Sequence, residues 1–460
     1  MTAPQDLVEH ALQVSRADDC VVIVSDSTQA NLRWANNTLT TNGVMHHVTA
    51  TVVSFAASAN GTASGSVTGS AATPDQLTAL VEAADAAAKQ GSAAEDAAEL
   101  VGDRASADWQ DAPVSTSIDV FADFAPALGE AFGRAGDGKR VLYGYVEHDL
   151  TTSYLGSSTG LRLRHVQPTG HYGCTGKTAD LTSSAWVGGA SIDFTDVDPL
   201  ALEAALERRL GWSSRTVDLP AGRYDCVLPP TAVADLMIYA YWSASARQAY
   251  EGQSVFSARG GGTRIGEALT GKPVQLFSDP AYPGLEAAPF VTASASSSET
   301  SVFDNGLALE RTHWVKDGRL SALLQTRHSA GLTGQPVTPA IDNLVLSVDG
   351  GDGDLDALVS GMDRGLLLTC LWYIREVDPQ TLLLTGLTRD GVYLVEHGEV
   401  TGAVNNFRFN ESPVSLLDRF SHASATVPGF SREWGDYFPR TAMPALRVPD
   451  FNMSTVSQAQ

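Results

Sequence analysis

The sequence predicts an α+β protein in which a layered α/β domain, residues 1–219, precedes a β-rich, antiparallel and barrel-like domain, residues 220–460. A chain of 460 residues is too long for one ordinary hydrophobic core. Strand-like segments alternate with long helical patterns in the first half, whereas short strand-like runs dominate the second half. The pattern changes at Pro220-Ala221-Gly222, which therefore marks the expected boundary.

In the first domain, apolar periodicity distinguishes the expected helices from the expected strands. The sequence CVVIVS at residues 20–25 is typical of a buried strand. A polar segment at residues 31–39 is expected to separate it from the next strand, and the Gly/Ser/Thr-rich residues 61–69 are typical of turns. Helices are expected at residues 6–14, 76–89, 121–133 and 199–210, and further strands at residues 49–55, 141–150, 161–167 and 185–190.

The second domain is organised around one long apolar segment, residues 229–257. A helix of about twenty residues is expected to begin at Pro229-Pro230-Thr231 and to end at Gly252. Its apolar residues recur every three to four positions, which predicts a face buried in the core. Strands are expected after it at residues 274–277, 290–294, 310–316, 319–325 and 343–348, followed by a short helix at 355–360 and a β meander from 365 to 409.

The chain is strongly acidic, with 53 Asp and Glu residues, 30 Lys and Arg residues and a formal charge of −23. This charge opposes binding to nucleic acid or to an anionic membrane, so neither partner is expected. No apolar run approaches the roughly 18 residues of a membrane span, and the N-terminus lacks a signal core. A soluble cytoplasmic protein is expected, in agreement with four widely spaced cysteines that form no CxxC motif.

Several side chains are candidate metal ligands or nucleophiles. His165, His171 and Cys174 form the most metal-like cluster, but their spacing is not that of a standard zinc site, and a hairpin with one packed cysteine is the expected explanation. The adjacent His46 and His47 would point to opposite faces of a strand and would not chelate one ion together. The chain contains no GxSxG nucleophile elbow and no glycine-rich nucleotide motif.

Two segments, GQSVFS at residues 252–257 and GVYLVEHGEV at residues 391–400, resemble signatures of the TldD/PmbA (TldE) family of metallopeptidases. The resemblance implies that the TldD-type subunit carries a zinc-binding His-Glu-x-x-x-His on the helix before the first signature. In this chain Met237 and Trp242 stand at the histidine positions, and Ile238 stands at the glutamate position. None of these side chains can ligate zinc or act as a general base.

The resemblance implies a second zinc ligand, a cysteine in a Cys-Gly-Lys segment before the last strand of the TldD-type subunit. Here no cysteine follows Cys370, so both ligand positions are empty. The chain is therefore expected to be a PmbA/TldE-type subunit with no catalytic residue, metal ligand or cofactor of its own.

The implied assembly is a heterodimer in which a TldD-type subunit holds zinc and cleaves unfolded or ribosomally made peptides. This chain would shape the substrate channel. The expected peptide-binding residues are Ser254, Val255, Phe256, Arg264, Asp304 and Asn305. Two alternatives stay open: an independent hydrolase with a non-family metal site, and a homodimeric peptide-binding protein.

Overall fold

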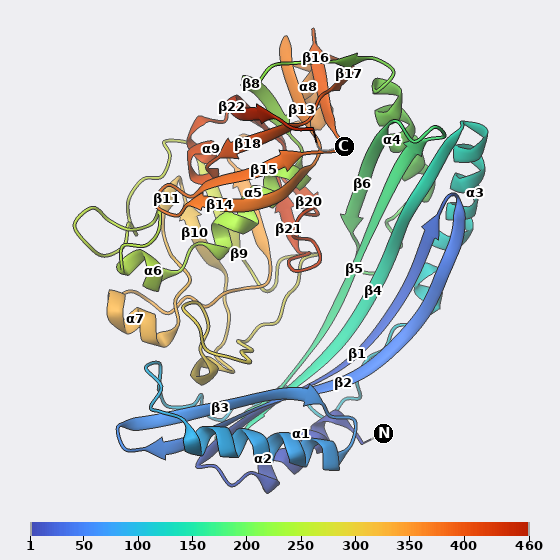
Figure 1. Cartoon of the computed structure of the whole chain (residues 1–460). Coiled ribbons are helices and arrows are strands. Elements are labelled where there is room, and N and C mark those ends of the chain that lie inside the picture. Colours follow the sequence, from blue (N-terminus) through green and yellow to red (C-terminus); the bar gives the residue numbers. More distant parts are fainter. Residues whose placement is uncertain (1, 459–460) are drawn as a thin grey trace.

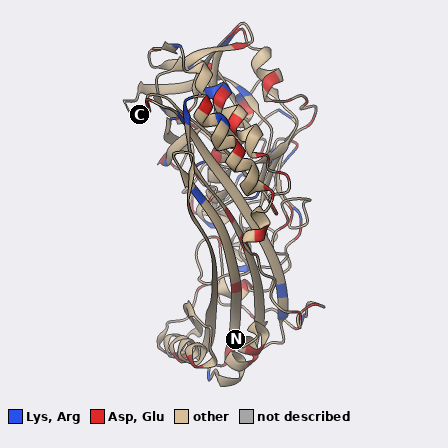
Figure 2. Cartoon of the chain, turned by 90° about the vertical axis from the view of Figure 1, so that its right-hand side faces the viewer, with Lys and Arg blue, Asp and Glu red and all other residues tan. Residues whose placement is uncertain are grey.

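The computed structural model describes residues 2–458. The N-terminal part is one long, curved antiparallel sheet in the order β3-β2-β1-β4-β5-β6 (Figure 1). Its strands are β1 (Asp19–Ala35), β2 (Thr38–Ser58), β3 (Gly61–Ser70), β4 (Arg140–Ser157), β5 (Arg162–Thr178) and β6 (Ser184–Ala190). Helices α1 (Pro4–Val14) and α2 (Pro74–Gln90) cover one end of the sheet, and α3 (Phe124–Asp137) and α4 (Pro199–Trp212) cover the other end (Figure 1). On the face in Figure 2, basic and acidic side chains are interspersed along α3 and α4.

The C-terminal part contains two further sheets. The smaller has the order β11-β10-β9-β12-β21-β20, and the larger has the path β14-β15-β18-β22-β8-β13-β16-β17-β7, with β19 paired to β22. The smaller sheet comprises β9 (Val274–Ser278), β10 (Thr312–Lys316), β11 (Arg319–Leu320), β12 (Leu344–Val348), β20 (Val427–Gly429) and β21 (Thr441–Met443). The larger comprises β7 (Thr216–Val217), β8 (Gly222–Leu228), β13 (Arg364–Leu368), β14 (Leu371–Asp378), β15 (Leu383–Thr388), β16 (Val392–Glu396), β17 (Glu399–Val404), β18 (Phe407–Glu411), β19 (His422–Ala423) and β22 (Leu446–Val456).

Helix α5 (Pro230–Trp242) lies in the core of the C-terminal part. One apolar cluster contains its side chains together with Leu276 of the smaller sheet and Leu366 of the larger sheet. The remaining helices in this part are short: α6 (Ala246–Tyr250), α7 (Arg327–Thr333), α8 (Leu355–Ser360) and α9 (Pro413–Arg419). Within residues 2–458, no helix combines the length and the apolar character that crossing a membrane requires.

The long helix predicted for residues 229–251 is instead two helices, α5 and α6, because residues 243–245 are not helical. The Ser243 hydroxyl donates a hydrogen bond of 2.9 Å to the Tyr239 carbonyl oxygen, and Ser245 caps α6. Serine hydroxyls compete with the helical backbone in this way. The backbone of Ala246 also donates to the Leu324 carbonyl oxygen at 3.0 Å, which pulls the segment out of the helical path.

The glycine-rich segment at residues 61–69, predicted to form turns, is instead strand β3. Helix α2 explains its composition. A Cβ on Gly65 would lie 2.3 Å from the Ala88 nitrogen and 2.6 Å from the Ala84 oxygen, both in the backbone of α2. Small residues are therefore required here by close helix packing and not by a turn.

The polar residues 31–39, predicted to separate two strands, mostly continue β1, which ends only at Ala35. The turn itself is at Asn36 and Asn37, which have φ angles of 51° and 58°. Asparagine tolerates this left-handed conformation, as a tight hairpin requires. Despite these local differences, the predicted α+β fold class is confirmed.

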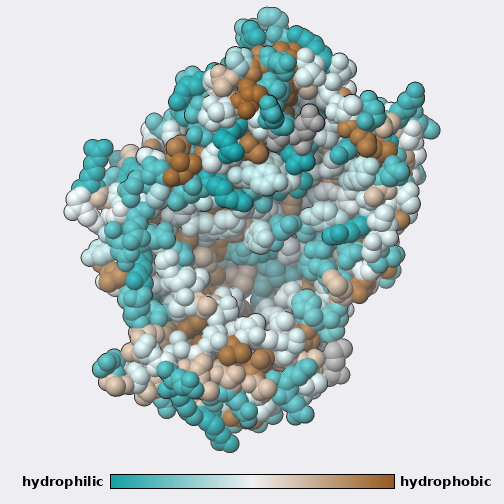
Figure 3. Space-filling model, viewed as in Figure 1, coloured by the Kyte–Doolittle hydropathy of each residue, from teal (hydrophilic) through white to brown (hydrophobic). Residues whose placement is uncertain are grey.

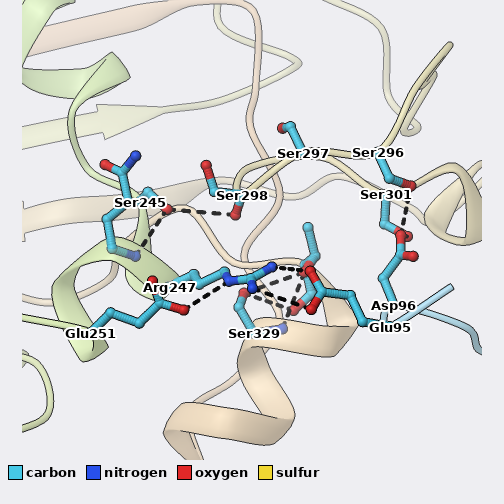
Figure 4. Close-up of polar contacts among 12 residues, drawn as sticks. Glu95, Asp96, Ser245, Arg247, Glu251, Ser296, Ser297, Ser298, Ser301 and Ser329 are labelled. Atoms are coloured by element: carbon cyan, nitrogen blue, oxygen red, sulfur yellow. Dashed lines mark hydrogen bonds and ion pairs between the residues drawn. The ribbon is translucent and has the colours of Figure 1, made fainter. Parts of the chain in front are cut away.

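Polar contacts join the loop after α2 to the C-terminal part (Figure 4). Arg247 forms ion pairs with Glu95 and with Glu251, the second at 3.0 Å. The Asp96 carboxylate accepts hydrogen bonds of 2.6 Å from the hydroxyls of Ser296 and Ser301. The loop after α2 thus contacts the serine-rich loop at residues 294–301 through Asp96 and contacts α6 through Glu95.

Candidate functional site: the α5 helix and the cavities beside it

The three positions at which the resemblance places catalytic groups lie on helix α5. Met237 and Ile238 are fully buried, and Trp242, the last residue of the helix, is 37 % exposed. The helix is buried on nearly every side because its sequence, PTAVADLMIYAYW, is apolar apart from one aspartate. The Met237 and Ile238 side chains therefore belong to the core, and only Trp242 reaches a surface.

The segment at residues 431–438 packs directly against α5. The Trp434 ring lies 5.8 Å from the Tyr239 ring and 5.4 Å from the Trp242 ring, with an edge-on arrangement to Trp242. Its indole Nε1 donates a hydrogen bond of 2.9 Å to the Asp235 carbonyl oxygen. The fold thus brings together the helix and the C-terminal segment that precedes the final strand, and it fills the space between them with aromatic rings.

Asp235 is a residue that the sequence reasoning missed. Its side chain is fully buried, and Oδ1 accepts hydrogen bonds from the Ser431 hydroxyl at 2.6 Å and from the Glu433 backbone nitrogen at 3.1 Å. Oδ2 is buried and has no hydrogen-bond partner among the described residues. Burial raises the pKa of Asp235 to about 7. The available signal was a single charged residue in an otherwise apolar helix.

Within the part of the chain that the structure describes, no three His, Cys, Asp or Glu residues are placed to hold a metal ion together. Glu433, the carboxylate next to Asp235 in space, accepts a hydrogen bond of 3.1 Å from the Ile374 backbone and lies 3.5 Å from Arg375. The site therefore offers one buried carboxyl group and aromatic surfaces.

Two cavities have Trp242 in their walls. The first, which we call the Ser254 cavity, has a volume of about 620 Å³ and includes Ser254, Val255 and Trp434 in its wall. The second, the Asp304 cavity, has a volume of about 680 Å³ and lies between β4 and β5 of the first sheet and the C-terminal loops. Figure 3 shows the molecule hollowed in this region between the first sheet and the C-terminal part.

The predicted peptide-binding residues divide between these cavities and the protein interior. Ser254 and Val255 line the Ser254 cavity, and Asp304 lines the Asp304 cavity, where it pairs with Arg327 at 2.6 Å. The other three line neither cavity. Phe256 and Asn305 are buried, and Arg264 pairs with Glu267 and donates to the Val255 carbonyl oxygen.

The metal-like cluster of His165, His171 and Cys174 does not converge. All three lie on β5, where side chains alternate between faces, so Cys174 faces away from the two histidines. Cys174 packs in the core beneath α3 and α4, whereas the His171 ring stacks on Phe430 at 5.6 Å. His165 contacts Gln167 at 3.0 Å. His46 and His47 are also separate, and His46 pairs with Asp26 at 2.9 Å.

The four cysteines are buried and unpaired. Burial raises the pKa values of Cys20, Cys174 and Cys370 to about 12 and that of Cys226 well above its ordinary value. A thiol held in its neutral form is a poor nucleophile. These cysteines therefore act as small apolar side chains in the core.

Comparisons with known proteins agree with this architecture. A search of curated protein sequences finds no match. Among solved structures, the chain is similar to TldE from Thermococcus kodakarensis, with a TM-score of 0.76 and 15 % identity over 98 % of this chain and 99 % of that one. It is also similar in structure to proposed modulators of DNA gyrase from Thermotoga maritima (TM-score 0.75, 15 % identity, covering 97 % of this chain and 99 % of that one) and from Bacteroides thetaiotaomicron (TM-score 0.75, 14 % identity, covering 98 % of each chain).

These structural similarities show the shared fold over the whole chain. The model of the PmbA/TldA metallopeptidase C-terminal domain matches residues 221–455, which is more than half of the sequence. The chain therefore belongs to the PmbA/TldD metallopeptidase family.

Proposed function

We propose that this chain is a metal-free subunit of the TldE type, which joins a TldD-type zinc metallopeptidase and helps to form its peptide channel. The observation that carries the proposal is the packing of Trp434 against Tyr239 and Trp242. Aromatic rings fill the space between the helix and the C-terminal segment, the two places where the resemblance puts the zinc ligands. Zinc requires imidazole, thiolate or carboxylate groups at such positions.

The chain would contribute to peptide binding through its cavities and its sheet edges. Trp242 lines both the Ser254 cavity and the Asp304 cavity, so an extended peptide that occupied both would contact its side chain. Strands β6 and β20 are sheet edges, and Gly188, Gly189 and Gly429 line a further cavity of about 750 Å³ between them. Edge strands hold extended peptides by main-chain hydrogen bonds with little sequence preference.

The partner would supply the zinc and the chemistry, and the substrates would be unfolded or ribosomally made peptides in the cytoplasm. We also propose that residues 1–219 and 220–460 act as the two domains of this subunit. The geometry of His165, His171 and Cys174 gives no support to an independent hydrolase built on those residues, because they lie on different faces of β5.

The test is reconstitution with a TldD-type protein encoded by the same genome. Each protein alone and the mixed pair are assayed on an unstructured peptide, with size-exclusion chromatography to measure association. We expect a stable pair whose peptide turnover exceeds that of the TldD-type protein alone. Separate behaviour of the two proteins, or self-association of this chain with no gain in turnover, would favour the homodimeric binding protein instead.

A variant of this chain tests the channel within the pair. Trp242→Ala should alter the KM for the peptide, because it removes the side chain that borders both cavities. The matched control is Tyr250→Ala, because Tyr250 is similarly exposed, at 44 %, and lines neither cavity. Equal KM values for the two variants would count against a peptide path across Trp242.

A further inference from the structure

A cavity of about 740 Å³ lies where β5 of the first sheet meets the large C-terminal sheet. We call it the Arg432 cavity. Its wall contains three basic side chains, Lys177, Arg389 and Arg432, and one acidic side chain, Asp390; most of the remaining wall carries hydroxyl groups. A concentration of positive charge is unexpected in a chain with a net charge of −23. The cavity is distinct from the two cavities beside Trp242.

Arg432 is held by aromatic rings and not by a carboxylate. Its guanidinium carbon lies 4.6 Å from the centre of the Trp186 ring and 4.0 Å from the centre of the Trp372 ring. No ion pair to Arg432 is present among the described residues, and its Nε is buried without a hydrogen-bond partner. Stacking fixes the guanidinium plane but leaves the donors at its edge unused.

Other donors in the same wall also lack partners. The Trp372 Nε1 and the Tyr393 hydroxyl are both buried, and neither forms a hydrogen bond within residues 2–458. Leaving such groups unpaired costs free energy. Because neither atom is exposed to the cavity, the donors that can meet a ligand there are the terminal nitrogens of Arg432, the Lys177 ammonium and the hydroxyls of the wall. Guanidinium and ammonium groups donate only, and hydroxyls can donate, so a ligand bound in this cavity would supply acceptor oxygens.

The one acidic side chain in the wall is already engaged. Asp390 accepts a hydrogen bond from the Ser184 hydroxyl and lies 3.6 Å from the Arg389 Nε. A further half-buried arginine, Arg209, donates a hydrogen bond to the carbonyl oxygen of Trp186, one of the two tryptophans that contact Arg432. Arg209 has no carboxylate partner among the described residues. Lys177 and Arg432 thus form no ion pair among the described residues, and Arg209 adds to the positive potential.

We propose that the Arg432 cavity binds an oxyanion, that is, a carboxylate or phosphate group of a small ligand or of a peptide. The hydrogen-bond donors come from the edge of the Arg432 guanidinium group, from Lys177 and from the surrounding hydroxyls. The indole rings of Trp186 and Trp372 hold the guanidinium group in place. Arginine recognises carboxylate and phosphate through paired hydrogen bonds from its planar fork. This inference does not depend on the proposed association with a TldD-type partner.

The experiment is isothermal titration calorimetry on the full chain at constant ionic strength. The probes are inorganic phosphate, succinate, and an acetylated tetrapeptide with a free C-terminal carboxylate or with the corresponding amide. We expect at least one oxyanion probe to bind. Arg432→Gln should lower the affinity for that probe about tenfold or more, because the variant loses one charged hydrogen-bonding group. Arg259→Gln, a change at an exposed arginine outside the cavity, should bind like the wild type.

The probes distinguish the sources of the oxyanion. Binding of phosphate or succinate alone indicates a small free ligand, whereas binding of the acid peptide and not its amide indicates a peptide carboxylate. Lys177→Gln provides a second, half-buried position in case Arg432→Gln disturbs folding, and it should also weaken binding. The proposal is overturned if no oxyanion probe binds the wild type, or if a probe binds Lys177→Gln and a folded Arg432→Gln variant with unchanged affinity.

Discussion

The indole Nε1 of Trp434 donates a hydrogen bond of 2.9 Å to the backbone carbonyl oxygen of Asp235, across 199 positions of sequence. This bond, together with the Ser431 hydroxyl on the Asp235 carboxyl group, fastens the C-terminal segment to the central helix α5. The segment and the helix are thereby held as one packed unit, and the aromatic side chains between them close the space.

Substitution of Trp434 measures the strength of this packing. Trp434→Phe keeps most of the ring contacts and loses one hydrogen bond, so the free energy of unfolding should fall by about 1 kcal/mol. Trp434→Ala also removes the contacts with Tyr239 and Trp242 and should cost about 3 kcal/mol. Urea unfolding measures both values. Equal stability of the two variants would show that the ring contacts contribute little.

The buried carboxyl group of Asp235 predicts a specific pH dependence of stability. Its pKa is raised to about 7 in the folded protein, whereas an unfolded aspartate has a pKa of about 3.9. Between these two values the folded state keeps a proton that the unfolded state has lost. The free energy of unfolding should therefore decrease as pH rises from about 4 to about 7, by up to about 1.4 kcal/mol per pH unit for this group.

Asp235→Asn removes the titrating group, so its stability should fall less steeply with pH than that of the wild type over the same range. Urea unfolding at several pH values measures the two slopes. Asp352→Asn, a change at an exposed aspartate, is the control and should keep the wild-type slope. If the free energies of unfolding of the wild type and Asp235→Asn changed in parallel with pH, the raised pKa of Asp235 would be contradicted.

The ion pair between Asp304 and Arg327 should be much more important for stability than the pairs in Figure 4. The Asp304 side chain is 3 % exposed and accepts hydrogen bonds from both the side chain and the backbone nitrogen of Arg327. Arg327→Gln leaves this carboxylate buried without its cation and should cost about 3 kcal/mol. Arg247→Gln breaks pairs with Glu95 and Glu251 at the surface and should change stability far less. Chemical unfolding of both variants tests this difference.

Two glycines in neighbouring strands predict opposite outcomes for the same substitution. Gly65→Ala places a Cβ against the backbone of α2 and should lower the free energy of unfolding by about 2 kcal/mol. Gly43→Ala, in β2, has no atom within 4 Å of the new Cβ and should be neutral or slightly stabilising. Melting temperatures of the two variants provide the comparison. A Gly65→Ala variant as stable as the wild type would show that a Cβ at this position fits between β3 and α2.

The sequence was informative where local pattern and tertiary environment agree. The helix predicted at residues 199–210 corresponds to α4, Pro199–Trp212, since a proline start and apolar periodicity are local signals. It was misleading at residues 61–69, where the need for glycine comes from the backbone of α2, which is distant along the chain from Gly65. The break at residues 243–245 was missed for a similar reason, because the contact with Leu324 is tertiary.

The candidate site was predicted only in part. The resemblance identified Met237, Ile238 and Trp242 as positions without ligating groups, and the structure places them on α5. It gave no indication that Trp434 would pack against Trp242, since aromatic contacts across 192 positions leave no periodic pattern. Asp235 was visible as a lone acid in an apolar helix, but its partner Ser431 could be found only from the fold.

The zinc content of the purified components tests the central claim most directly. This chain and a TldD-type partner are purified separately and as a pair, and each is analysed by inductively coupled plasma mass spectrometry alongside a peptidase assay. The account predicts zinc in the partner and in the pair, and only trace zinc and no peptidase activity in this chain alone. About one zinc ion bound per molecule of this chain alone, with peptidase activity that a chelator abolishes, would contradict it.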